Sequence, residues 1–180
     1  MLWDKLDNSN LPNASEFEDH VSQWADLLNQ PIPKIKRISL DIEVETETGR
    51  LIIPDPKLAE KKVTAIGVEA SDGLKQIFVL RKSGVEEGIN ELLPDVKVVF
   101  YDENKEKEMI SDIFELIQKY PLLITYNGDS FDLPYLYNRA NKLGITKEKN
   151  PLYMMRDSAT LIKGVHLDLY RTMSNRAFQT

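Results

Sequence analysis

The chain has 180 residues, 42% hydrophobic and 29% charged, with no apolar run of about 18, so we expect one cytoplasmic domain without a membrane span. It has no cysteine and two histidines, which excludes disulfides, thiolate zinc sites and multi-histidine sites and leaves oxygen ligands, typical of magnesium or manganese. The net charge of −6 disfavours a strongly basic nucleic-acid surface, yet residues 34–180 are nearly neutral, with 23 acidic and 22 basic side chains.

Residues 1–33 differ in character from the rest of the chain. They hold six acidic residues and one basic residue, and apolar side chains at helical spacing predict a helix over residues 16–30. Pro31 and Pro33 then end that helix. We interpret the segment as an N-terminal linker whose helix packs on the main domain or belongs to the end of an upstream domain.

From residue 34 onward the pattern changes to strands. Apolar residues alternate through KRISLDIEV and predict a strand over Lys34–Glu45 with one apolar face. VTAIGVEA and LKQIFVL predict a hairpin that turns at Asp72-Gly73. The remaining elements are predicted in the order strand VKVVFY, helix ENKEKEMISDIFELIQKY, strand LLITYN, helix DLPYLYNRANKL and strand VHLDLY.

This element order predicts an α/β fold. The first strand is expected at the centre of a mixed sheet, with the antiparallel hairpin on one side and LLITYN and VHLDLY parallel to it on the other. Helices should flank the sheet. Three antiparallel strands followed by alternating helices and strands are the element order of the ribonuclease H-like fold, although a fold alone does not give a function.

Two carboxylates stand on the expected central strand. Asp41 and Glu43 are two residues apart, so they share one face and lie roughly 6–7 Å apart along the strand. Two acids placed side by side repel each other and are costly to desolvate, which favours a bound cation. The alternative is that this strand lies at a sheet edge and that water solvates both acids.

A second polar cluster follows the strand LLITYN. Asn127 ends that strand, where ligand sites of α/β sheets gather, and Asp132 falls in the first turn of the next helix. Alone, Asp132 is equally well explained as a partner of the helix dipole, and Phe131 as a core residue. In the expected fold the two clusters are neighbours, and such carboxylates hold two divalent ions that promote phosphodiester hydrolysis. No Ser–His–Asp pattern and no glycine-rich phosphate loop competes.

The two clusters resemble known motifs. RISLDIEVE resembles the first exonuclease motif of family B DNA polymerases, and YNGDSFDLPYL resembles the second. HLDLY and GRLIIPDPKLAEKKVTAIGVEASDG are similar to archaeal members, so the resemblance covers about residues 35–175. It implies a 3′→5′ proofreading exonuclease domain of an archaeal family B polymerase, with Asp41, Glu43 and Asp132 as catalytic ligands of two Mg²⁺ or Mn²⁺ ions.

The same resemblance implies how the substrate is held. Asn127 and Phe131 are expected against the 3′-terminal nucleotides of single-stranded DNA, and Tyr126 is expected to add stacking. The implied partners are the 3′ end of a single strand and the polymerase domains of the same protein. Because the body of the chain is nearly neutral, we expect weak, salt-dependent binding of single strands and poor binding of duplex.

The family also needs a fourth carboxylate, in a Tyr-x3-Asp motif downstream of HLDLY, and the chain reaches Thr180 before it. Residues 34–180 are therefore expected to be an exonuclease domain cut before its third motif. Tyr153 and Asp157 match the pattern but come too early, and Asp168 is expected to be a strand residue near the site. Two alternatives stay open: a catalytically impaired fragment that binds only metal or single strands, and a related nuclease acting on RNA.

Overall fold

The computed structural model describes residues 14–31, 33–46, 53–84, 94–156 and 158–175. The chain divides into two compact units, Met1–Lys34 and Ile35–Thr180. The first unit contains α1 (Ala14–Asn29), a helix where the apolar spacing predicts one. No helix in the described part of the chain is long and apolar enough to cross a membrane.

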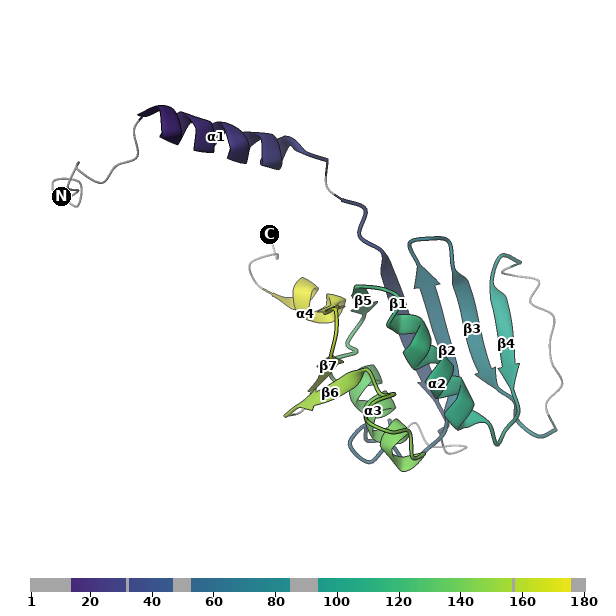
Figure 1. The fold of residues 1–180 in the computed structure, drawn as a ribbon. Helices are drawn as coiled ribbons and strands as arrows, with labels where there is room; N and C mark the ends of the chain where they lie inside the picture. The colour runs from purple at the N-terminus through teal and green to yellow at the C-terminus, as the bar shows by residue number, and fades with distance from the viewer. Residues whose placement is uncertain (1–13, 32, 47–52, 85–93, 157, 176–180) are drawn as a thin grey trace. The chain divides into compact units, whose positions relative to one another are not determined.

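The second unit is built on a six-stranded mixed sheet with the order β4-β3-β2-β1-β5-β8 (Figure 1). β1 pairs antiparallel with β2 and parallel with β5, β2 pairs antiparallel with β3, and β8 pairs parallel with β5. The central position of β1, the hairpin and both parallel strands are therefore confirmed. The strands are β1 (Arg37–Val44), β2 (Val63–Ala70), β3 (Lys75–Leu80), β4 (Lys97–Tyr101), β5 (Leu122–Thr125) and β8 (Val165–Asp168).

Helices α2 (Glu106–Ile117) and α3 (Asp132–Lys142) supply the other half of the core. Figure 1 shows α2 lying across one face of the sheet. On β1, Ile38, Leu40 and Ile42 are buried, whereas the residues between them are exposed, as the alternation predicts. The odd-numbered side chains of β1 therefore point to the opposite, open face of the sheet. This arrangement of a mixed sheet and flanking helices is that of a ribonuclease H-like fold.

Three features differ from the expected elements or go beyond them. β6 (Leu152–Met155) and β7 (Ser158–Leu161) form a separate antiparallel hairpin that was not predicted. β4 pairs parallel with β3, a placement that the sequence left open. VHLDLY is not a strand throughout, because β8 ends at Asp168 and α4 (Leu169–Ser174) begins. The Asp168 side chain causes this change by accepting a hydrogen bond from the backbone N–H of Tyr170, as helix-capping residues do.

A buried ion pair ties α2 and α3 to the start of β2. The Arg139 guanidinium donates to both oxygens of Glu106, at 2.8 and 2.7 Å, and the two side chains are 11% and 5% exposed. Glu106 also accepts from the backbone N–H of Val63 at 2.8 Å, and Arg139 donates to the carbonyl of Glu60 at 2.9 Å. All these groups are satisfied by one another, which is the condition for burying charge at tolerable cost.

Candidate active site

Asp41 and Glu43 stand on the open face of the sheet. Both side chains are exposed. In the pairing of β1 with β2, Asp41 lies opposite Gly67 and Glu43 lies opposite Ala65. β1 is not an edge strand, so the alternative that placed these acids on a sheet edge is wrong in that respect, although both acids are exposed. The parallel pairing of β1 with β5 nevertheless stops at Ser39, and beyond it β1 has a strand partner on one side only.

Asp132 takes the place of the missing partner. It is the first residue of α3, it is 4% exposed, and its Oδ1 accepts a hydrogen bond of 3.0 Å from the backbone N–H of Ile42. Ile42 lies between Asp41 and Glu43, so α3 delivers a third carboxylate to the strand that carries the other two. Asp132 therefore makes a contact with a residue 90 positions earlier in the chain, in addition to any interaction with the dipole of its own helix.

The surroundings of Asp132 disfavour the charged form of its carboxyl group. Burial, the largest influence, raises the pKa of its carboxyl to about 6. The hydrogen bond from Ile42 lowers the pKa, while the negative charges of Asp41 and Asp168 raise it. A cation near this carboxylate would relieve the repulsion.

The three acids do not form a finished metal centre. Within the described ranges, no group of three or more histidine, cysteine, aspartate or glutamate side chains is close enough to hold a metal ion. The donor set consists of oxygen alone, which fits Mg²⁺ or Mn²⁺ and does not fit zinc.

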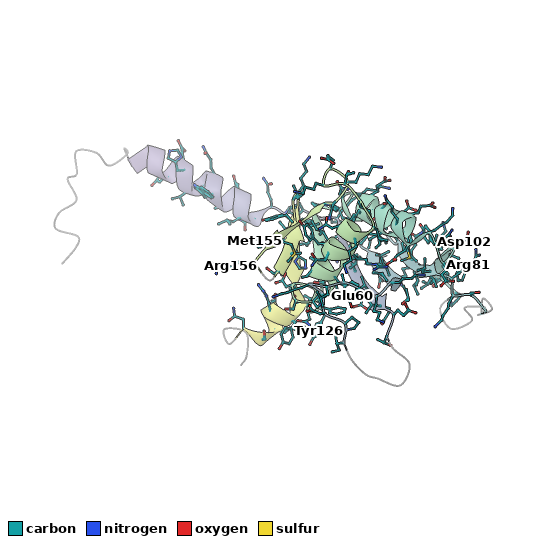
Figure 2. The ribbon with its side chains drawn as sticks, turned by 90° about the horizontal axis from the view of Figure 1, so that it is seen from below. Glu60, Arg81, Asp102, Tyr126, Met155 and Arg156 are labelled. Atoms are coloured by element: carbon teal, nitrogen blue, oxygen red, sulfur yellow. The ribbon has the colours of Figure 1, made fainter. Side chains whose placement is uncertain are left out.

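The predicted DNA contacts have different environments. Tyr126 is 62% exposed, its ring meets the ring of Tyr170 edge-on at 5.7 Å, and Figure 2 shows it beside α4. With Asp41, Tyr126 lines an open cavity of about 560 Å³ on the uncovered side of the sheet. Asn127 is half-buried with φ of 60°, and half-buried Phe131 packs on Tyr135 at 5.5 Å between ring centroids. Of the three, Tyr126 is the most exposed.

Comparison with known proteins now decides the family. The model of the DNA polymerase family B exonuclease domain matches residues 6–179. The chain belongs to this family. A family B exonuclease domain is a 3′→5′ exodeoxyribonuclease with a proofreading role, and the family uses divalent metal ions.

Archaeal DNA polymerases are among the relatives of this exonuclease domain. It is 38% identical over 161 residues to DNA polymerase 1 of Sulfolobus acidocaldarius, covering 89% of the chain and 18% of the relative. It is 41% identical over 181 residues to DNA polymerase 1 of Saccharolobus solfataricus, covering 97% of the chain and 20% of the relative. DNA polymerase 1 of Aeropyrum pernix is 33% identical over 164 residues, covering 91% and 17%. The exonuclease chain therefore spans about a fifth of the length of these relatives.

Asp168 contributes to the exonuclease domain through backbone contacts that its sequence position did not reveal. Its Oδ1 accepts from the backbone N–H groups of Asn127 and Tyr170, both at 2.9 Å, and its Oδ2 accepts from that of Asp129 at 3.0 Å. Burial raises the pKa of Asp168, but these backbone hydrogen bonds outweigh it and the net shift is downward. The other candidate for a fourth carboxylate, Asp157, lies outside the described residues.

Proposed function

We propose that Asp41, Glu43 and Asp132 of this exonuclease domain hold two divalent cations, Mg²⁺ or Mn²⁺. The observation that carries the proposal is the hydrogen bond from the backbone N–H of Ile42 to Asp132, which brings a third acid to the strand that carries Asp41 and Glu43. The raised pKa of Asp132 supports it, because a nearby cation would offset the repulsion. Paired cations of this kind activate a water and stabilise the leaving oxygen of a phosphodiester.

The substrate of this site is the 3′ end of single-stranded DNA, frayed from the primer during proofreading by the polymerase domains of the same protein. Tyr126 offers an exposed ring beside Asp41, and stacking on aromatic rings is how single strands are held without regard to sequence. Asn127 and Phe131 contact the terminal nucleotides from the same loop. Residues 34–180 form the exonuclease domain and residues 1–33 a linker, and the protein works in the cytoplasm.

The metal site is tested by replacing one ligand. Asp41→Ala should weaken Mn²⁺ binding at least about tenfold in calorimetric titration, because it removes one of three negative donors. Glu69→Ala is the matched control, since Glu69 is an exposed acid on β2 that lies opposite Ser39 in the same sheet. Equal Mn²⁺ affinity in the wild type and Asp41→Ala would show that the three carboxylates are not a metal site.

The substrate contact is tested at Tyr126. Tyr126→Ala should weaken binding of a single-stranded oligonucleotide by about 1–3 kcal/mol, the usual contribution of one base stacked on an aromatic ring. Fluorescence anisotropy in the presence of a chelator measures binding without hydrolysis. Tyr153→Ala, which removes a 42% exposed ring from β6, should have no effect. Tight duplex binding that is unaffected by Tyr126→Ala would contradict the proposed substrate.

A further inference from the structure

A chain of hydrogen bonds joins β5, the loop after it and β8. The Oγ1 of Thr125 lies 2.8 Å from Nε2 of His166, and the Nδ1 of His166 lies 3.0 Å from Oδ1 of Asp129. The other oxygen of Asp129 is 2.7 Å from Nε of Arg171 on α4. Burial, the largest influence, lowers the pKa of His166, so its ring is neutral near pH 7 and Thr125 donates to Nε2.

Threonine, histidine and aspartate in this order have the connectivity of a nucleophilic triad, an arrangement that was not predicted. Nucleophilic attack is ruled out by access. Thr125 is 3% exposed, and a Cβ added to Gly128 would lie 2.3 Å from its hydroxyl oxygen, so the loop backbone covers that oxygen. The His166 side chain is only 3% exposed. The chain of hydrogen bonds therefore holds the loop between β5 and α3, which covers it, in place.

Asp168 holds the same loop from a second direction. It accepts hydrogen bonds from the backbone N–H groups of Asn127 and Asp129. Asn127 has the left-handed conformation that is unusual for residues other than glycine. The loop then runs directly into α3, and Leu133 donates from its backbone N–H to the carbonyl of Gly128 at 3.0 Å. Asp132 thus directly follows a loop that is held by hydrogen bonds to His166 and to Asp168.

We propose that Thr125, His166, Asp129 and Asp168 form a brace that positions Asp132 against β1, and that Asp168 is a positioning residue and not a metal ligand. The brace is defined by these four side chains. This inference rests on the proposed role of Asp132 in the metal site. Small displacements of a group that orients reacting atoms can cost about 100-fold in rate, so the brace matters to hydrolysis without touching the substrate.

The test compares two substitutions at one position. Thr125→Ser keeps the hydroxyl that donates to His166, whereas Thr125→Val keeps the branched shape and removes it. Asp168→Asn is the third variant. Its side-chain amide places N–H groups where one carboxylate oxygen of Asp168 accepts a hydrogen bond from a backbone N–H. Amide hydrogen exchange by NMR reads out the N–H of Ile42, which donates to Asp132, while amides of the β1–β2 pairing serve as internal controls.

We expect Thr125→Val and Asp168→Asn to speed exchange at Ile42 at least about tenfold while the β1–β2 amides keep their protection, and Thr125→Ser to match the wild type. Unchanged protection of Ile42, or an equal loss at all amides, would overturn the brace. Mn²⁺ titration decides the role of Asp168. Both Thr125→Val and Asp168→Asn should weaken Mn²⁺ binding to a similar degree, since both displace Asp132, and the loss of an ion in Asp168→Asn alone would make Asp168 a ligand. If the wild type bound no Mn²⁺, the proposed metal site would fail, while the exchange data would still judge the brace.

Discussion

Asp132→Asn should abolish exonuclease activity and at the same time make the metal-free protein more stable at about pH 7.5. The loss of activity should be at least about 100-fold, because a ligand that orients the reacting groups is gone. The gain in stability follows from the pKa of Asp132, which is about 6 in the folded state, whereas an aspartate without these interactions has a pKa of 3.8. A shift of about two pKa units corresponds to about 3 kcal/mol in the free energy of unfolding.

The sign of this effect depends on pH. A carboxyl whose folded pKa is raised contributes stability below its unfolded pKa, and that contribution is lost as the pH rises through about 6. The neutral amide of Asp132→Asn loses nothing over this range. The variant should therefore exceed the wild type above about pH 6 and approach it near pH 4, as urea denaturation in chelator will measure.

Added Mn²⁺ should reverse the order of stability. The wild type gains about 4.1 kcal/mol at a metal concentration of about 1,000 times its dissociation constant, and Asp132→Asn gains much less. Asp72→Asn is a suitable control. Asp72 lies at the β2–β3 turn, where its carboxylate accepts a hydrogen bond from the hydroxyl of Tyr120. If Asp132→Asn proved less stable than the wild type at about pH 7.5 without metal, the charge of Asp132 could not be unfavourable in the folded state.

Arg139→Ala should lower the free energy of unfolding by about 3–5 kcal/mol. The substitution leaves the carboxylate of Glu106, 5% exposed, buried without its bidentate partner, and breaking such a pair from one side is strongly destabilising. It also removes a donor to the carbonyl of Glu60, which helps to hold the segment before β2. Denaturant unfolding followed by circular dichroism measures the change.

An exposed ion pair provides the comparison. Arg81 and Asp102 lie together at 2.9 Å where β3 and β4 end (Figure 2), and their side chains are 46% and 58% exposed. Arg81→Ala should cost no more than about 1 kcal/mol, since water screens the charges and replaces the contact. Similar losses in Arg139→Ala and Arg81→Ala would mean that burial of the Glu106 pair contributes nothing of its own.

The part of the site that the sequence predicts is the part with a regular pattern. Alternation along β1 requires that Asp41 and Glu43 share the face opposite Ile42, and the structure confirms this. The position of Asp132 at the start of a helix also follows from sequence. Its bond to Ile42 does not, because it depends on where β5 stops pairing with β1.

The features that escaped prediction have no local signal. The β6–β7 hairpin turns through Arg156 at φ of 55°, where glycine or asparagine would have marked a turn. Asp168 looks like one more residue in the alternation of VHLDLY, and only the backbone N–H groups of a loop 39–41 residues earlier explain its burial. Likewise, Thr125 and His166 become partners through the parallel pairing of β5 with β8.

The contact between Ile42 and Asp132 also orders events during synthesis of the protein. The β1–β3 meander needs only residues 37–80 and can form early, because short loops cost less entropy to close. The Ile42–Asp132 bond closes a span of 90 residues and must wait until α3 has left the ribosome. A nascent chain therefore displays Asp41 and Glu43 long before Asp132 can join them, so the proposed metal site would form only after α3 has folded.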